Sequence, residues 1–218
     1  MSIADLEVDN IIRGNLNNYD PSIKILSEEN EFSLNSYLEE CYWIIDPIDG
    51  TQSYISEGNE YTINIALIYQ GKPYLGLIAH PPSKKIWYAK NNKLTIIHDS
   101  VKKTYENNVK KKDFITIITS KEFNYETEEF IKNFKNSKRI KLSSSLKFCK
   151  LAENEADLYP RFSSISKWDI AAGHAILNAS GGEIIKINGL NFNYNNKSSR
   201  TGKFLAISRK INKKKLNL

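Results

Sequence analysis

Two aspartates, Asp46 and Asp49, flank a proline and stand directly before Gly50 and Thr51 in the segment IIDPIDGTQ. Because a residue before proline is driven out of the α region, Asp46 is expected to end a strand, with Asp49 just past the bend. The two side chains can then approach each other, and ionised carboxylates held that close favour a bound cation such as Mg²⁺. Asp, Pro and Gly are equally the residues of an ordinary tight turn, so the segment alone is compatible with both interpretations.

Two other places in the chain could add carboxylates to this pair. Glu28 and Glu29 follow a short apolar run, and one of them can project from the same sheet edge as Asp46, although an exposed glutamate pair is the more ordinary interpretation. Asp169 lies in the first turn of an expected helix, where an acid is usually just a favourable partner for the helix dipole. The three small residues at 171–173 would let that helix approach another backbone closely and bring Asp169 toward a neighbouring site.

Phosphate could be bound by residues of two kinds. Gly50 and Thr51 stand at an expected helix start, where free N–H groups favour an anion. Ser144 and Lys147 begin a later helix, and Arg161 ends an expected strand. A phosphate near both cations would be held by charge-assisted hydrogen bonds, although each cation is equally compatible with an ordinary solvated surface.

Apolar periodicity predicts the elements that position these residues in the first half of the chain. A helix is expected over residues 4–16, with Asp5 and Asp9 on its solvated side. Gly71 lies in a short loop between two apolar runs, which predicts a hairpin. The expected strands are 23–26, 41–45, 61–69, 73–79, 86–89 and 94–98.

From Lys110 onward strands alternate with helices, which is typical of an α/β layer architecture. The expected strands are 114–119, 139–142, 156–162, 183–187 and 204–208, and the expected helices are 126–134, 144–153 and 168–179. The lysine-rich, apolar-poor stretch 101–112 is the natural boundary between two halves of the chain. We therefore predict an N-terminal α+β half over residues 1–110 and a C-terminal α/β half over residues 111–218.

Length and composition limit the class of protein. The chain has 218 residues, of which 40% are hydrophobic and 26% charged, as in soluble globular proteins. The net charge of +6 suits an anionic partner, but no basic stripe is interleaved with aromatic residues, so nucleic-acid binding is not expected. No secretory signal or membrane-spanning run is present. Cys41 and Cys149 lie in apolar surroundings, which predicts two reduced, buried thiols in a cytoplasmic protein.

Two motifs in this order resemble the signatures of the inositol monophosphatase-like superfamily of magnesium-dependent, lithium-sensitive phosphatases. They are WIIDPIDGT at residues 43–51 and WDIAAG at residues 168–173. Within this superfamily the chain resembles the bacterial 3′(2′),5′-bisphosphate nucleotidase branch, through SSLKFC at 144–149 and ADLYPRF at 156–162. The resemblance extends over residues 3–208. It implies a layered α/β/α/β fold with the site between the two halves.

The resemblance also implies a role for each site residue. Metal ions would be bound by Glu28, Asp46, Asp49, Asp169 and the backbone carbonyl of Ile48, with Asp5 near a third, loosely held ion. The expected catalytic residues are Glu28, Asp49 and Thr51, of which Glu28 and Thr51 would orient the attacking water. The residues expected to contact the substrate are Glu28, Ile48, Asp49, Gly50, Thr51, Ser144, Lys147, Arg161 and Asp169.

The reaction implied by the resemblance is hydrolysis with two or three Mg²⁺ ions, inhibited by Li⁺. Its substrate would be adenosine 3′,5′-bisphosphate, which loses its 3′-phosphate in sulfate assimilation, with the sulfated precursor as a second candidate. An inositol or sugar phosphatase is the alternative, and Lys147 and Arg161 discriminate because only a second substrate phosphate needs them. An inactive remnant is a further alternative. The resemblance leaves open whether the protein associates peripherally with the cytoplasmic face of the inner membrane.

The N-terminus departs from the superfamily pattern. Members begin with a further helix and loop, which precede the segment that contains the equivalent of Asp5. Without that helix, apolar surface worth about 25 cal/mol per Å² would be uncovered. We therefore expect poor solubility or a homodimer that covers this surface, and the missing loop also weakens the expectation of catalysis.

Overall fold

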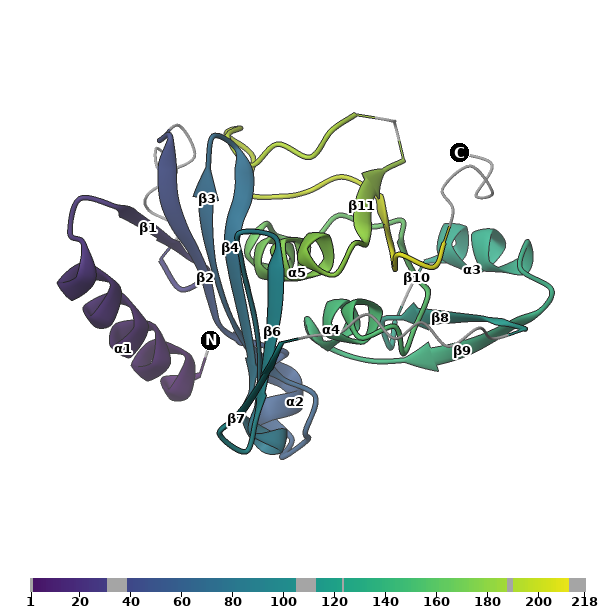
Figure 1. The fold of residues 1–218 in the computed structure, drawn as a ribbon, viewed down its shortest axis with the longest axis horizontal. Helices are drawn as coiled ribbons and strands as arrows, with labels where there is room; N and C mark the ends of the chain where they lie inside the picture. Colours follow the sequence, from purple (N-terminus) through teal and green to yellow (C-terminus); the bar gives the residue numbers. More distant parts are fainter. Residues whose placement is uncertain (1, 31–38, 105–112, 123, 188–189, 212–218) are drawn as a thin grey trace.

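Two β-sheets, one in each half of the chain, organise the structure (Figure 1). The computed structural model describes residues 2–30, 39–104, 113–122, 124–187 and 190–211. In the first sheet the strands follow one another in chain order, with β1 parallel to β2 and every later pair antiparallel. These strands are β1 (Lys24–Ser27), β2 (Cys41–Asp49), β3 (Thr62–Tyr69), β4 (Lys72–His80), β5 (Lys85–Lys90), β6 (Lys93–His98) and β7 (Val101–Thr104).

The second sheet has the strand order β11-β12-β10-β8-β9. The strand β8 runs parallel to both of its neighbours, whereas β12 is antiparallel to β10 and β11. The strands are β8 (Ile115–Thr119), β9 (Ser137–Lys141), β10 (Leu158–Arg161), β11 (Glu183–Lys186) and β12 (Phe204–Ile207).

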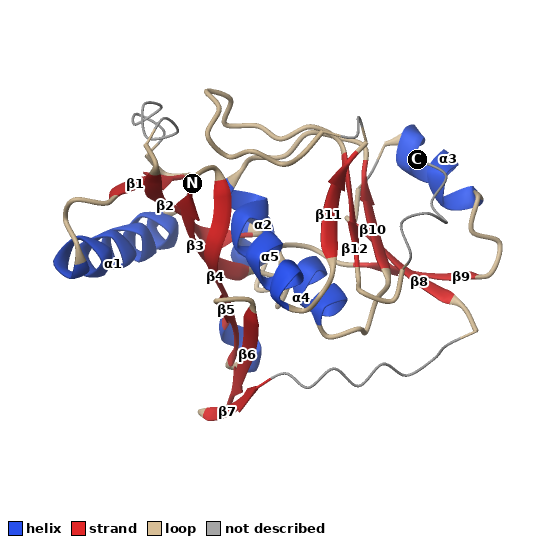
Figure 2. Cartoon of the chain, turned by 45° about the horizontal axis from the view of Figure 1, so that its top comes forward, coloured by secondary structure: helices blue, strands red, loops and turns tan. Residues whose placement is uncertain are grey.

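The helices form layers around the two sheets (Figure 2). They are α1 (Ile3–Tyr19), α2 (Thr51–Ile55), α3 (Tyr125–Lys132), α4 (Leu146–Ala152) and α5 (Trp168–Ala179), and a 3₁₀ turn, Pro81–Ser83, joins β4 to β5. The helix α1 lies outside the first sheet, and α4 and α5 lie between the two sheets. This succession confirms the predicted α/β/α/β fold, with α3 on the far face of the second sheet. No helix in the described ranges is both long and apolar enough to cross a membrane.

Small residues allow α5 to pack directly on the first sheet. A Cβ added at Gly76 in β4 would lie 2.5 Å from the carbonyl oxygen of Ala172, and one added at Gly173 would lie 2.3 Å from the Phe148 ring of α4. Side chains at either position would clash, because both approaches are closer than real Cβ contacts. The predicted close approach of this helix is therefore confirmed. It brings Asp169, in the first turn of α5, to the edge of the sheet.

Two expectations about local structure are wrong, and one further strand was not expected. The strand β2 does not end at Asp46 but continues to Asp49, with a register shift against β3 between the two residues. Such a bulge accommodates Pro47, which has no N–H to donate to a ladder. Residues 101–104 pair with β6 as the edge strand β7. Cys41 is only partly buried, whereas Cys149 is fully buried. The division between 1–110 and 111–218 stays a prediction, because its boundary falls outside the described residues.

The inward side of α1 is acidic, which contradicts the expectation that Asp5 and Asp9 face solvent. These two residues are the buried ones of the helix. Asp9 accepts a hydrogen bond of 2.5 Å from the Ser27 hydroxyl at the end of β1, and Asp5 joins Ser2 in a capping box. The Ser27 hydroxyl on the sheet therefore accounts for the inward position of Asp9, and the Thr51 hydroxyl of α2 lies 3.4 Å from Asp5. Ile3 and Ile11 are 78% and 64% exposed.

Candidate active site

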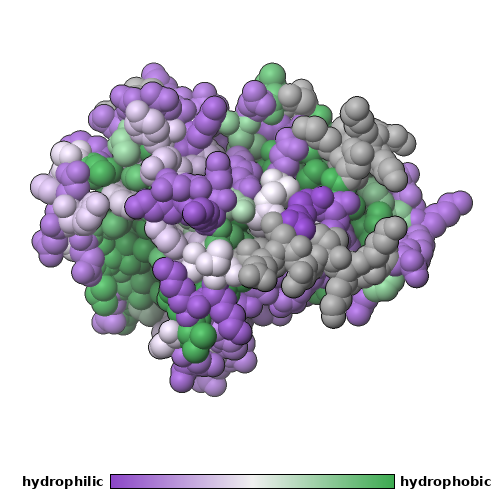
Figure 3. Space-filling view, in the orientation of Figure 1, coloured by the Kyte–Doolittle hydropathy of each residue, from purple (hydrophilic) through white to green (hydrophobic). Residues whose placement is uncertain are grey.

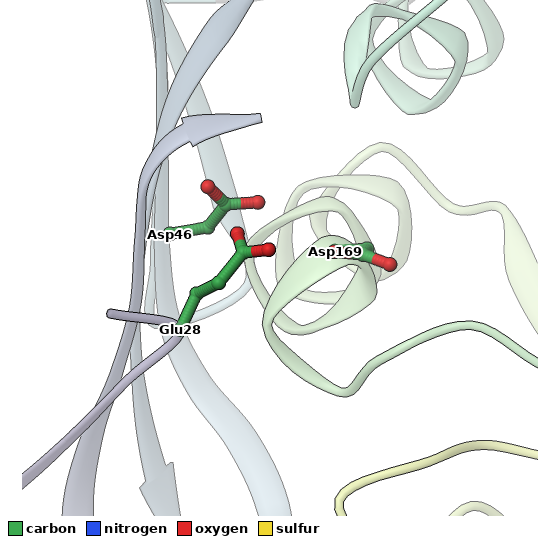
Figure 4. A group of neighbouring side chains, drawn as sticks. All are labelled: Glu28, Asp46 and Asp169. Atoms are coloured by element: carbon green, nitrogen blue, oxygen red, sulfur yellow. The ribbon is translucent and has the colours of Figure 1, made fainter. Parts of the chain in front are cut away.

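The carboxylates of Glu28, Asp46 and Asp169 meet between the first sheet and α5 (Figure 4). One oxygen from each lies within 4.8 Å of the other two. Glu28 directly follows β1, and its N–H donates to the carbonyl oxygen of Ile45 in β2 at 3.2 Å. This bond sets Glu28 beside Asp46, while Asp169 approaches from the first turn of α5. The expectation that one of two glutamates shares the sheet edge of Asp46 is confirmed for Glu28.

Burial and mutual repulsion disfavour the ionised forms of these carboxyl groups. Asp46 is fully buried, and burial raises its pKa well above the usual value, with the charges of Asp49 and Glu28 adding to the effect. Burial, followed by the same two charges, raises the pKa of Asp169 to about 7. Glu28 is exposed as a whole residue, yet its carboxyl group turns into the cluster, and the burial of that group is the main cause that raises its pKa.

Asp46 shows that the cluster fits a cation. Both of its oxygens are buried, and neither has a hydrogen-bond donor among the described residues. A buried carboxylate without a donor or a counter-charge is strongly unfavourable, and a divalent cation removes that penalty. A set of carboxylate oxygens is what Mg²⁺ prefers in proteins. The residues present therefore suit a magnesium site.

Asp49 is held by hydrogen bonds at the side of this cluster. Its Oδ2 atom accepts hydrogen bonds from the Ser145 hydroxyl at 2.6 Å and from the Asn64 amide at 3.1 Å, and the Thr62 hydroxyl lies 3.5 Å away. Ser145 also lies 2.9 Å from the main-chain carbonyl oxygen of Asp169. Ser145 and Asn64 were not predicted as site residues. Ser145 is 96 positions from Asp49, and its sequence signals are a run of three serines and its place in the SSLKFC motif, neither of which points to Asp49.

The predicted turn into a helix is present at Gly50 and Thr51, where β2 meets α2. Gly50 has a φ of 93°, a left-handed conformation that favours glycine, and an added Cβ would lie 2.8 Å from the Glu60 carbonyl oxygen. The Thr51 hydroxyl donates to the carbonyl oxygen of Ile48 at 3.0 Å and lies 3.4 Å from the Asp5 carboxylate. The structure thus brings Asp5, Ile48 and Thr51 together at the start of α2.

Three of the five residues predicted to bind phosphate, Ser144, Lys147 and Arg161, line one pocket with two of the acids. The pocket has a volume of about 160 Å³ and is lined by Asp49, Ser144, Lys147, Phe148, Tyr159, Arg161, Ile165 and Asp169. A larger hollow of about 820 Å³ lies beside β6 and β7, and none of the predicted site residues lines it. Cations and carboxylates therefore converge at the smaller pocket, between the two halves of the chain.

The two cations of this pocket differ in their hydrogen bonding. Lys147 is buried, which contradicts the solvated-surface alternative, and its ammonium group donates to the carbonyl oxygens of Ser144 at 2.5 Å and Leu142 at 3.3 Å. Arg161 donates to the Ser120 hydroxyl at 2.7 Å. Its Nε is buried and has no partner within the described part of the chain. Arg161 therefore retains a donor that could bind an anion.

Known proteins resemble this chain in sequence and in fold. The inositol monophosphatase family model matches residues 1–217. The 3′(2′),5′-bisphosphate nucleotidase CysQ of Salmonella typhimurium is 34% identical over 201 residues, which cover 91% of this chain and 81% of the relative. The CysQ nucleotidase of Buchnera aphidicola is 35% identical over 199 residues, covering 88% of this chain and 72% of the relative. The crystal structure of CysQ from Bacteroides thetaiotaomicron, a bacterial member of the inositol monophosphatase family, has a TM-score of 0.86 at 29% identity and covers 95% of this chain and 84% of that one.

Proposed function

The chain belongs to the inositol monophosphatase family, and on that premise we propose that it removes the 3′-phosphate of adenosine 3′,5′-bisphosphate in a magnesium-dependent reaction. The observation that carries this proposal is the pocket in which Lys147 and Arg161 lie beside Asp49 and Asp169. A substrate with two phosphates matches a site in which acids and cations stand side by side. The nucleotidase names of the relatives support the same substrate class.

The acids of the site would hold the cations. We assign two Mg²⁺ ions to Glu28, Asp46, Asp49, Asp169 and the carbonyl oxygen of Ile48, and a third, weaker position to the neighbourhood of Asp5. Bound there, divalent cations neutralise charge on the phosphoryl oxygens and favour an activated water as the nucleophile. We also propose that Li⁺ inhibits the reaction, as the resemblance to lithium-sensitive phosphatases implies.

The remaining polar groups would orient the reactants. Glu28 accepts a proton from the attacking water, which Thr51 helps to orient through its hydroxyl. The N–H groups of Gly50 and Thr51, at the start of α2, face the scissile phosphate. Lys147 and Arg161 bind the second phosphate, and Ser144 contacts the nucleotide. Because the Lys147 ammonium group donates to two carbonyl oxygens, it must exchange these partners for phosphate oxygens when substrate binds.

A phosphate-release panel tests this assignment. Adenosine 3′,5′-bisphosphate, its sulfated precursor, inositol 1-phosphate and fructose 1,6-bisphosphate are compared with Mg²⁺, each with and without Li⁺. We expect the two nucleotides to be hydrolysed fastest. Hydrolysis of the inositol ester but not of the nucleotides would replace the proposal by the inositol phosphatase alternative. No turnover of any substrate, with Mg²⁺ binding retained, would support an inactive remnant.

Replacing Lys147 by Met is expected to raise the KM for adenosine 3′,5′-bisphosphate about 10- to 100-fold, since hydrogen bonds to charged groups are worth this much. The KM for inositol 1-phosphate should stay within about threefold, because that substrate has no second phosphate. The matched control is Lys150→Met on the same helix, whose ammonium group pairs with Glu155 on the exposed surface. If Lys147→Met raised the KM of both substrates equally, Lys147 would not be the residue that binds the second phosphate.

The outer face of the first sheet supports a homodimer. Apolar residues gather over the α1 end of the molecule (Figure 3). Ile65, Leu67 and Leu75 are only partly buried there, and Ile11 of α1 is exposed. We propose that a second copy of the chain covers this face, since apolar patches of this kind often mark protein contacts. Sedimentation should show a dimer that becomes a monomer in Ile11→Lys, and a wild-type monomer at high concentration contradicts the proposal.

The family resemblance implies a cytoplasmic location and allows peripheral association with the membrane, and both stay proposals. The free thiols of Cys41 and Cys149 support a reducing compartment. The net charge of +6 would favour contact with an anionic lipid surface. Flotation with vesicles that contain anionic lipid distinguishes a membrane-associated protein from one that stays in solution.

A further inference from the structure

Ser145 connects the two halves of the chain at the acid cluster. Its side chain is buried, and its Oγ atom lies 2.6 Å from Oδ2 of Asp49 and 2.9 Å from the main-chain carbonyl oxygen of Asp169. Asn64 of β3 donates from its amide both to this Oγ, at 2.9 Å, and to Oδ2 of Asp49, at 3.1 Å. One hydroxyl thus touches residues from the end of β2, from β3 and from the start of α5.

The hydroxyl of Ser145 is not used for the helix that it precedes. A serine directly before a helix usually accepts a hydrogen bond from a free N–H of the first turn. Ser145 immediately precedes α4 but makes no such bond. Its oxygen is turned toward Asp49 instead. The side chain therefore serves a contact between the halves and not the local stability of α4.

The Ser145 hydroxyl is best placed to donate its one hydrogen bond to Asp49. Ser145 has two acceptors within reach, the Asp49 carboxylate and the Asp169 carbonyl, but it can donate only one hydrogen bond. The contact with Asp49 is shorter, and hydrogen bonds to an ionised acceptor are the stronger ones. With Ser145 and Asn64 both donating to Oδ2, that oxygen is occupied. Oδ1 is then the oxygen of Asp49 left to bind a metal ion.

The backbone around Ser145 is held in an unusual conformation that keeps this contact in place. Ser144 has a φ of 53°, in the left-handed region that residues other than glycine rarely adopt. The N–H of Ser143 donates to the Glu60 carboxylate of the first half at 3.0 Å. The Cβ of Ser144 lies 3.4 Å from the Cβ position that Gly50 lacks. The segment 143–145 is therefore fixed against the turn that carries Asp49 and Gly50.

From these contacts we infer that Ser145 is a positioning residue for the metal site, one that orients Asp49 so that only Oδ1 faces the cations. The inference rests on the proposed function, because it assumes that Asp49 binds Mg²⁺. Residues that orient metal ligands by hydrogen bonding typically change metal affinity or activity about 10- to 100-fold when they are removed. Ser145 acts through Asp49 and does not itself touch the metal or the substrate.

Calorimetric titration of Mg²⁺ in the absence of substrate tests the inference. Ser145→Ala should bind Mg²⁺ about 10- to 100-fold more weakly than the wild type. Saturating Mg²⁺ should restore its kcat to within about threefold, with the KM for substrate unchanged. A defect that Mg²⁺ rescues is not expected from a residue with a purely structural role. The matched control is Ser180→Ala, which removes another buried serine hydroxyl, one that donates to Leu177 within α5; its Mg²⁺ affinity should equal that of the wild type.

The outcomes separate the inference from the proposed function. Unchanged Mg²⁺ affinity in Ser145→Ala, with normal binding by the wild type, overturns the role of Ser145 alone. Absence of Mg²⁺ binding by the wild type overturns the proposed metal site itself. Should Ser145→Ala fail to fold, Ser145→Cys decides, because it keeps a side chain of similar size with a much weaker donor. That variant should also bind Mg²⁺ more weakly, and wild-type affinity there contradicts the inference.

Discussion

Asp46→Asn is expected to abolish phosphatase activity while making the metal-free protein more stable. Both Asp46 oxygens are buried without a hydrogen-bond donor among the described residues, and three other carboxylates surround the group. An amide cannot ionise, so folding no longer has to bury or protonate a carboxylate at this position, and the amide can donate a hydrogen bond to Glu28. Relief of about 2 kcal/mol would raise the melting temperature by about 4–8 °C in a chain of this length. The same change removes a ligand shared by the cations, and we expect kcat to fall at least about 1,000-fold.

Two measurements on the same protein check this prediction: thermal unfolding in the presence of a chelator, and phosphate release with saturating Mg²⁺. The control is Asp113→Asn, which neutralises an exposed aspartate and should leave both values unchanged. If Asp46→Asn lowers the melting temperature of the metal-free protein, the cluster is not under electrostatic strain. If the variant retains more than a tenth of the wild-type kcat, Asp46 is not a metal ligand.

Removal of the metal ions is expected to make the stability of the wild-type protein fall as the pH rises from about 4 to about 7. Asp169 has a pKa of about 7 in the folded protein, against 3.8 for an unperturbed aspartate. Between these values the folded protein binds more protons than the unfolded chain, so the free energy of unfolding decreases with rising pH. The stabilising contribution is complete below the lower value and lost above the upper one. Asp169 alone accounts for a change on the order of 4 kcal/mol, and the raised pKa of Asp46 acts in the same direction.

Mg²⁺ should reverse this loss, because a bound cation favours the ionised carboxylates and stabilises the folded state. Urea unfolding at several pH values between 4.5 and 7.5, with chelator and with Mg²⁺, measures both effects. Asp169→Asn isolates the contribution of one group, since its unfolding free energy should depend less steeply on pH in the chelator series. Parallel profiles for the wild type and Asp169→Asn would show that Asp169 does not titrate as the structure implies.

Local sequence patterns were sufficient to locate most elements and the acids of the site. Helix α5 has the bounds 168–179 that its run of apolar and small residues predicts, and the hairpin at Gly71 is present. Helical and strand periodicity, turn residues and the restriction imposed by Pro47 all act over a few positions, so a single sequence shows them. The acidic turn that carries Asp46 and Asp49 before Gly50 belongs to this class. The end of β2 was misplaced, because a bulge let the strand continue past Pro47.

Short-range patterns therefore specify the element types, the acidic turn and the family resemblance. Which side chains of distant segments meet depends on the packing of the whole chain. Asp9 turns inward because Ser27 of the sheet offers a hydroxyl, and Ser145 reaches Asp49 because α5 packs closely on Gly76 and draws the second half toward β2. Neither contact has a local signal, since the free energy that selects it comes from packing between residues far apart in the chain. The pocket that unites cations and carboxylates is a product of that packing.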